Sequence, residues 1–183
     1  MALMTRRLAL AAGGTLAAAF AARKPHAEEP AALASALRKV DPPEALPDVP
    51  FLSADGAEHH LAAYHGQGVV VNLWATWCAP CVAEMPFLAA LAAAVAPDRI
   101  AVLPLSSDRG GATTVSAWFK AHGVTGLPVL LDPKSAVVSA WKAHGIPTSF
   151  VINRQGLCCG RLEGAANWSA PDAIALVRKL VGA

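Results

Sequence analysis

Two cysteines separated by two residues, Cys78 and Cys81, have the side chains best suited to chemistry in this 183-residue chain. The motif Cys78-Ala79-Pro80-Cys81 follows the apolar run 69–74 and opens a stretch with helical spacing of apolar residues. A thiol at a helix N-terminus lies near unpaired backbone N–H groups and the positive end of the helix dipole, which stabilise a thiolate. We therefore expect Cys78 to be the nucleophile. Cys81, one turn further along, is expected to be shielded and to resolve a mixed disulfide on Cys78.

Two other interpretations of the pair are weaker. A zinc site would need a second Cys or His pair at ligand spacing, but the remaining cysteines, Cys158 and Cys159, are adjacent in sequence. His59, His60 and His65 lie close together, and we expect a surface group there rather than a metal site. A purely structural disulfide across three positions closes too small a loop to restrain the unfolded chain much. We therefore favour a redox pair with no metal and no cofactor, and the role of Cys158 and Cys159 stays open.

Strands and helices that could position this pair alternate along the chain. The turn sequence 53–56 between apolar segments 49–52 and 57–61 predicts a β-hairpin. The periodicity then predicts strands over 69–74, 100–105, 129–131, 148–152 and 157–162, and helices over 80–95, 113–122, 135–144 and 171–181. This order indicates an α/β three-layer sandwich with a mixed central sheet, parallel in its centre and antiparallel at one edge, extended by the N-terminal hairpin.

The N-terminus has the pattern of an export signal. Arg6 and Arg7 precede an apolar run over 8–22, which is a basic region followed by a hydrophobic region. The run is short for a bilayer span, which takes about 20 residues. Segment 5–10 partly resembles a twin-arginine signal, which would export the protein already folded. We expect residues 1–26 to be a cleaved signal peptide or an uncleaved signal anchor.

Prolines dominate the segment that follows the leader. Segment 27–47 contains Pro30, Pro42, Pro43 and Pro47 among alanines and acidic residues. This spacing predicts a linker rather than part of the fold, with a folded domain over 48–183.

Charge excludes one class of partner. The formal net charge is +2, but four of the 15 basic residues and none of the 13 acidic residues precede position 27. The remaining chain has 11 basic residues against 13 acidic ones and no cluster of lysine or arginine. Nucleic-acid binding is therefore not expected.

Segment 71–86, which contains the cysteine pair, resembles the active site of the thioredoxin superfamily and, more narrowly, of the TlpA/ResA-like thioredoxins of bacteria. The resemblance extends from about residue 46 to the C-terminus and implies a thioredoxin-like fold. Segment 145–148 resembles the family's cis-proline loop, which implies that Pro147 lies beside the cysteines and that the Ile146–Pro147 bond is cis. In that family, the residue before the proline pairs with the substrate backbone and the proline keeps metals away from the thiols.

The resemblance also assigns roles around the cysteines. It implies a docking surface made of Trp77, Ala79, Pro80 and the loop that carries Ile146 and Pro147. Asn72 stands where thioredoxins carry a buried aspartate that relays the proton of the resolving cysteine, and an amide cannot do so.

Glu84 matches an acid that TlpA/ResA-like proteins place near the active site. Helical spacing puts it roughly on the face of Cys81, where it could exchange protons with that thiol. The alternative is a solvated residue in the first turns of the helix.

The family implies a periplasmic, monomeric thiol–disulfide oxidoreductase, either soluble or tethered to the inner membrane. Its substrates would be protein disulfides or thiols of the apocytochrome c or copper-chaperone type. Electrons would come from a membrane thiol transporter of the DsbD or CcdA kind, in cytochrome c maturation or cytochrome oxidase assembly. Three alternatives are a disulfide-forming oxidant, a thiol peroxidase and a copper-binding assembly factor. The last two fit less well, because no arginine is close to Cys78 in sequence and the cysteines are separated by two residues rather than three.

Overall fold

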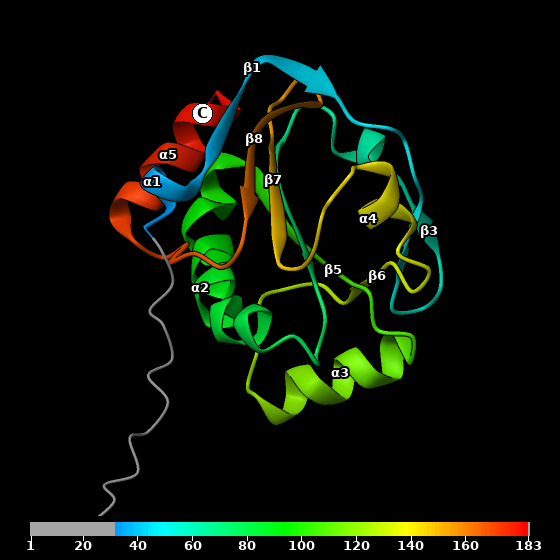
Figure 1. The fold of residues 1–183 in the computed structure, drawn as a ribbon. Helices are drawn as coiled ribbons and strands as arrows, with labels where there is room; N and C mark the ends of the chain where they lie inside the picture. The colour runs from blue at the N-terminus through cyan, green and yellow to red at the C-terminus, as the bar shows by residue number, and fades with distance from the viewer. Residues whose placement is uncertain (1–31, 183) are drawn as a thin grey trace, which may run out of the picture.

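The computed structural model describes residues 32–182 of the chain (Figure 1). The expected export signal over 1–26 lies outside the described residues.

An eight-stranded mixed sheet forms the centre of the fold, in the order β1-β8-β7-β4-β5-β6-β2-β3. Its strands are β1 Arg38–Ala45, β2 Phe51–Ser53, β3 Glu58–His59, β4 Gly68–Trp74, β5 Ile100–Ser106, β6 Leu130–Leu131, β7 Thr148–Ile152 and β8 Leu157–Glu163. Strands β4, β5 and β6 are parallel to one another, and the pairs on both sides of them are antiparallel. The mixed sheet with a parallel centre is confirmed. Antiparallel pairing occurs at both edges rather than one, because the β2–β3 hairpin adds to β6.

Helices cover both faces of this sheet (Figure 1). The α-helices are α1 Leu33–Ala36, α2 Ala79–Val95, α3 Gly111–Ala121, α4 Ala136–Ala140 and α5 Pro171–Val181, and two 3₁₀ turns are η1 Leu61–Tyr64 and η2 Ala96–Asp98. Side chains of α1, α2, α3 and α5 pack on one face, and those of α4 and η1 pack on the other. The thioredoxin-like three-layer arrangement expected from the sequence is therefore present.

Strand β4 is the innermost element, since all seven of its residues are buried. Its side chains alternate between the two faces: Val70 and Trp74 join the core under α2, whereas Val71 and Leu73 join the core under α4. A strand buried on both faces has an almost continuous apolar sequence, and this explains the run from which it was predicted. Asn72 is the polar exception, and by the same alternation it points toward α2.

The stretch Ala79–Asp98, α2 with η2, is long and apolar enough to cross a membrane by length and composition. Its side chains Met85, Leu88, Leu91 and Val95 are fully buried in the core on the α2 face of the sheet. We therefore interpret it as a core helix.

Segment 33–45 is not the linker that the prolines predicted. Arg38–Ala45 forms the edge strand β1 antiparallel to β8. Pro42 and Pro43 lie where the register of this pair shifts, and at an irregular edge a missing N–H disrupts no central ladder. Before β1, the short helix α1 lies beside α5 (Figure 1) and buries Leu33 to 1% exposure.

Strand β8 has a bulge at its two adjacent cysteines, Cys158 and Cys159. The register with β7 shifts so that Cys158 and Gly160 face consecutive residues of β7, which leaves Cys159 as the extra residue. The two thiols are free and lie in opposite core clusters, as the alternation of a strand predicted. Burial raises the pKa of both thiols, to about 11 for Cys159. The shifted register turns Arg161 toward α4, with its guanidinium carbon 5.2 Å from the ring centre of Phe150.

Leu33→Ala tests whether α1 and β1 belong to the folded domain. Removing a fully buried leucine leaves a cavity against α5, so we expect the free energy of unfolding to fall by about 2–5 kcal/mol in urea denaturation. The exposed Lys39→Ala in β1 is the control and should stay within about 0.5 kcal/mol of the wild type. Equal stabilities for the two variants would mean that the segment is a linker.

Candidate active site

Cys78 is the N-cap residue of α2, at the point where the chain leaves the carboxyl end of β4. Its Sγ accepts a hydrogen bond of 3.3 Å from the backbone N–H of Cys81, and Pro80 occupies the first helical turn, where it displaces no helical hydrogen bond. Cys78 and Cys81 form a disulfide. Cys78 is 7% exposed and Cys81 is fully buried. Of the two residues, Cys78 is therefore the one that keeps any contact with solvent.

The predicted cis-proline loop lies against this disulfide. The Ile146–Pro147 bond is cis, as the family resemblance implied. The carbonyl oxygen of Ile146 is 3.7 Å from Cys78 Sγ, and the next residue, Pro147, is buried. Antiparallel pairing of β4 with β7 explains this approach. Leu73 pairs with Thr148, so the segment that follows β4, with Cys78, and the segment that precedes β7, with Ile146, lie at the same end of the strand pair.

A groove of about 600 Å³ opens beside the disulfide. Trp77, Gly145 and Ile146 line one part of it, and Ser107, Arg109 and Val138 are among the residues that complete it. Trp77 is 71% exposed and is the exposed large apolar side chain of the part of the chain that the structure describes. Ala79 and Pro80, next to it, are exposed as well. An apolar surface with a free carbonyl beside a reactive sulfur can accommodate an extended polypeptide.

Asp108 fixes the segment that leads into Cys78. Its carboxylate accepts hydrogen bonds from the backbone N–H of Thr76 at 2.8 Å and from the Thr76 hydroxyl at 2.7 Å. The hydroxyl of Ser106, at the end of β5, also donates to Asp108 at 2.7 Å. These bonds join the carboxyl ends of β4 and β5, which limits the freedom of the chain just before Cys78.

Glu84 is fully buried, so the alternative of a solvated residue is wrong. Oε1 accepts a hydrogen bond from Nδ2 of Asn72 at 2.8 Å. Oε2 accepts two more, from the backbone N–H of Ala166 at 3.2 Å and from Nε1 of Trp168 at 3.1 Å. Burial raises the pKa of Glu84 from its ordinary value of 4.5 to about 7, although the three N–H donors favour the charged form. Near neutral pH this carboxyl can therefore both accept and release a proton, one helical turn from Cys81.

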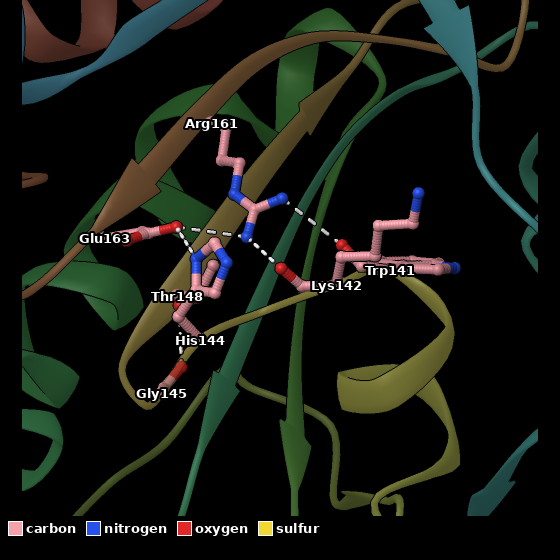
Figure 2. Close-up of polar contacts among 7 residues, drawn as sticks. All are labelled: Trp141, Lys142, His144, Gly145, Thr148, Arg161 and Glu163. Atoms are coloured by element: carbon pink, nitrogen blue, oxygen red, sulfur yellow. Dashed lines mark hydrogen bonds and ion pairs between the residues drawn. The ribbon is translucent and has the colours of Figure 1, made fainter.

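Arg161 anchors the end of α4, from which the cis-proline loop starts (Figure 2). Its guanidinium donates to the carbonyl oxygens of Trp141 and Lys142 and to Glu163, which also contacts His144 at 3.0 Å. The hydrogen bond to His144 holds the pKa of Glu163 below its ordinary value. The predicted helix over 135–144 ends earlier, because α4 stops before Trp141. Arg161 donates to the carbonyl oxygens of Trp141 and Lys142, and Lys142 adopts a left-handed conformation.

Several of these residues were not predicted from the sequence. Trp168 was not among the predicted site residues, but its indole donates a hydrogen bond to Glu84. Asp108 could have been found from the sequence. It follows a predicted strand, and the carboxyl ends of neighbouring parallel strands meet at one edge of a sheet, which would place it near Cys78. Arg161 could not have been found in this way, since a β-bulge that no sequence pattern marked decides which face it occupies.

Comparison with known proteins agrees with this geometry. The family model described as AhpC/TSA family matches residues 42–158. The chain is 31% identical over 110 residues to "Thiol-disulfide oxidoreductase ResA" of Geobacillus kaustophilus, which covers 60% of this chain and 62% of that relative's length.

Two solved structures have a similar fold. The pneumococcal exposed lipoprotein thioredoxin of Streptococcus pneumoniae has a TM-score of 0.58 at 25% identity, over 73% of this chain and all of that one. A secreted thiol-disulfide isomerase of Corynebacterium glutamicum has a TM-score of 0.68 at 19% identity, over 88% and 96% of the two chains. The resemblance to ResA-like thioredoxins and the thioredoxin-like fold are confirmed.

Arg161→Met should loosen the loop that carries Ile146. The substitution keeps an apolar stem over Phe150 but removes the donors to the carbonyls at the end of α4. We expect faster hydrogen–deuterium exchange of the backbone amides over 141–143, which are hydrogen-bonded in the structure.

Arg154→Met is the matched control, because Arg154 also donates to three carbonyl oxygens, those of Gly66, Asp98 and Gly182. It should leave exchange at 141–143 unchanged. Equal exchange in the two variants would contradict a specific anchoring role for Arg161.

Glu84→Gln should change how stability depends on pH. Because the folded protein has the higher Glu84 pKa, it keeps a proton between about pH 4.5 and 7 that the unfolded chain has released. Stability therefore falls as pH rises through this window, by about 3 kcal/mol in total, and stays low above it. A glutamine does not titrate. In urea unfolding from pH 5 to 8, the free energy of unfolding of the variant should therefore not show this decrease. The exposed Glu58→Gln should follow the wild type, and parallel curves for Glu84→Gln would contradict the raised pKa.

Proposed function

The chain belongs to the AhpC/TSA family of thioredoxin-like proteins, and from this we propose that it is a thiol–disulfide oxidoreductase with Cys78 as its nucleophile. The observation that carries the proposal is the position of the disulfide at the start of α2, where Cys81 is fully buried and Cys78 keeps 7% exposure beside the Ile146 carbonyl. On this basis a partner would react with Cys78, and Cys81 would react only with Cys78.

The reaction begins with the reduced pair. The Cys78 thiolate attacks one sulfur of a substrate disulfide; this forms an S–S bond to Cys78, and the other substrate sulfur leaves as a thiolate. The N-cap position supports the thiolate, because the Cys81 N–H already points at Cys78 Sγ. Cys81 then attacks Cys78, which releases the second substrate thiolate and leaves the Cys78–Cys81 disulfide. Two electrons pass from the enzyme to the substrate.

Glu84 has a defined task in the second step. Cys81 must lose its proton to attack, and it is buried away from water. We assign the acceptor role to Glu84, which follows Cys81 by one helical turn and has a pKa of about 7. The reverse reaction would return the same proton to Cys81.

The groove supports an extended protein substrate rather than a small molecule. Trp77 offers an exposed apolar face, and the Ile146 backbone lies beside Cys78. We propose that the substrate strand pairs with the backbone of Ile146 while its cysteine reaches Cys78, with Ala79 and Pro80 at the other side of the contact.

We extend the proposal to the compartment and the partners. The export pattern of residues 1–26 supports a periplasmic protein, soluble or tethered to the inner membrane. There it would act as a reductase in cytochrome c maturation or cytochrome oxidase assembly, on apocytochrome or copper-chaperone cysteines. Its electrons would come from a membrane thiol transporter of the DsbD or CcdA kind.

Trapping tests the function directly. Reduced Cys81→Ser, mixed with an oxidised synthetic peptide containing Cys-x-x-Cys-His, should accumulate a mixed disulfide on Cys78 that mass spectrometry can locate. Wild type should clear the same adduct and release reduced peptide, and Glu84→Gln should clear it more slowly. Cys78→Ser should form no adduct, whereas Cys158→Ser, at a buried thiol away from the pair, should behave as wild type.

Two outcomes would reject the proposal: no exchange with any disulfide, or an adduct on a cysteine other than Cys78. Rapid consumption of hydrogen peroxide without disulfide exchange would favour the thiol peroxidase alternative. The measured reduction potential of the pair separates a reductase from a disulfide-forming oxidant, because potentials on this fold span about 150 mV. Tight Cu(I) binding without exchange would favour the copper-binding assembly factor.

A further inference from the structure

The surroundings of Glu84 contain more than the proposed mechanism uses. Three donors from two separate parts of the chain converge on its two oxygens. One of them, Nδ2 of Asn72, also donates to the hydroxyl of Ser149 at 2.9 Å. Oδ1 of Asn72 is buried and has no hydrogen-bond partner among the described residues. A buried amide that uses only one of its two ends needs an explanation.

We propose that Trp168 and Asn72 are positioning residues for Glu84, Trp168 by fixing Oε2 and Asn72 by serving Oε1 in both the charged and the protonated state of the carboxyl. This inference rests on the proposed function, in which Glu84 exchanges a proton with Cys81.

Trp168 fixes one oxygen without being able to take a proton from it. Its indole N–H is a donor only, and so is the backbone N–H of Ala166 that reaches the same oxygen. The ring is fully buried, and the turn around it is closed by hydrogen bonds of Ser169 to the Asn167 side chain. Oε2 therefore stays an acceptor in both charge states, which leaves Oε1 as the oxygen that carries the proton.

Asn72 can satisfy Oε1 in either state. When Glu84 is charged, Nδ2 donates to Oε1 and to the Ser149 hydroxyl, as the structure has it. When Oε1 carries a proton, rotating the amide by half a turn puts Oδ1 in the place of Nδ2. Oδ1 can then accept from Oε1–H and from the Ser149 hydroxyl, which is able to donate as well as accept. An aspartate at this position could not donate to the carboxylate.

The strand register makes this arrangement possible. Asn72 of β4 and Ser149 of β7 are direct partners in the antiparallel pair, so both side chains emerge on the α2 face beside Glu84. The groups that bond Glu84 from β4 and from the segment before α5 are all neutral donors. The titratable neighbour on its own helix is Cys81, which the disulfide removes from titration.

The test measures the Glu84 carboxyl in the oxidised protein, with no substrate present. Glutamate labelled with ¹³C at Cδ gives a carboxyl signal, assigned by its loss in Glu84→Gln, that is followed from pH 4 to 10. Trp168→Phe keeps a buried ring but removes a donor to the charged form. We expect the Glu84 midpoint to rise by about one pH unit or more in Trp168→Phe. It should rise less in Asn72→Leu, because Asn72 can bond Oε1 in both charge states.

Trp141→Phe is the matched control. Trp141 is also buried, and its Nε1 donates at 2.9 Å to the Pro47 carbonyl on the other face of the sheet. A loss of stability from removing a buried indole would occur in both Trp→Phe variants. The Glu84 midpoint, in contrast, should move only in Trp168→Phe. In the reduced enzyme, the pH dependence of adduct clearance by Cys81 should shift in the same direction.

A measurement on the wild type makes the test independent of variant folding. The indole ¹⁵N–¹H signal of Trp168 should titrate with the midpoint of the Glu84 carboxyl, while the Trp141 signal should not follow it. A flat Trp168 signal, or an unshifted Glu84 midpoint in a folded Trp168→Phe, overturns the inference even if disulfide exchange is active. Absence of exchange instead rejects the proposed function and leaves this titration unaffected.

Discussion

The pairing of β4 with β7 is the constraint on which both halves of the site depend. Leu73 opposite Thr148 brings the chain before β7 to the end of β4, where the Ile146 carbonyl meets Cys78 Sγ. The next pair in the same register, Asn72 opposite Ser149, builds the polar contacts beneath the cysteines that reach Glu84. A slip of one residue would turn every side chain of β7 to the other face and separate both sets of contacts together. The proposed docking contact and the proposed proton transfer therefore depend on the same strand pair.

Glu84 illustrates a conflict between stability and activity. A carboxyl that ionises near neutral pH inside the core weakens the folded state over the range in which it is most useful. The hydrogen bonds from Asn72, Ala166 and Trp168 limit this destabilisation without removing it. An apolar residue at this position would pack more favourably but would remove the proton acceptor that we assign to Cys81.

Local sequence patterns were sufficient for the elements that carry strong periodicity or a motif. The Cys78–Cys81 pair, the buried run of β4 and the helix from Pro171 to Val181 were all predictable, because each depends on neighbours in sequence. Strand β1 was not, since its prolines are compatible with an edge strand only when a partner strand exists to receive it. The roles of Trp168 and Arg161 depend on contacts 84 and about 20 residues away, which no local pattern encodes.

The position of Cys158 and Cys159 in β8 has a consequence for the proposed electron transfer. Adjacent residues of a strand face opposite sides of the sheet, so the two thiols lie in different cores, and burial keeps both sulfurs in the unreactive protonated form. In the proposed reaction, the pair at the start of α2 is therefore the one redox couple among the four cysteines. Each reducing equivalent delivered to that couple would leave through Cys78.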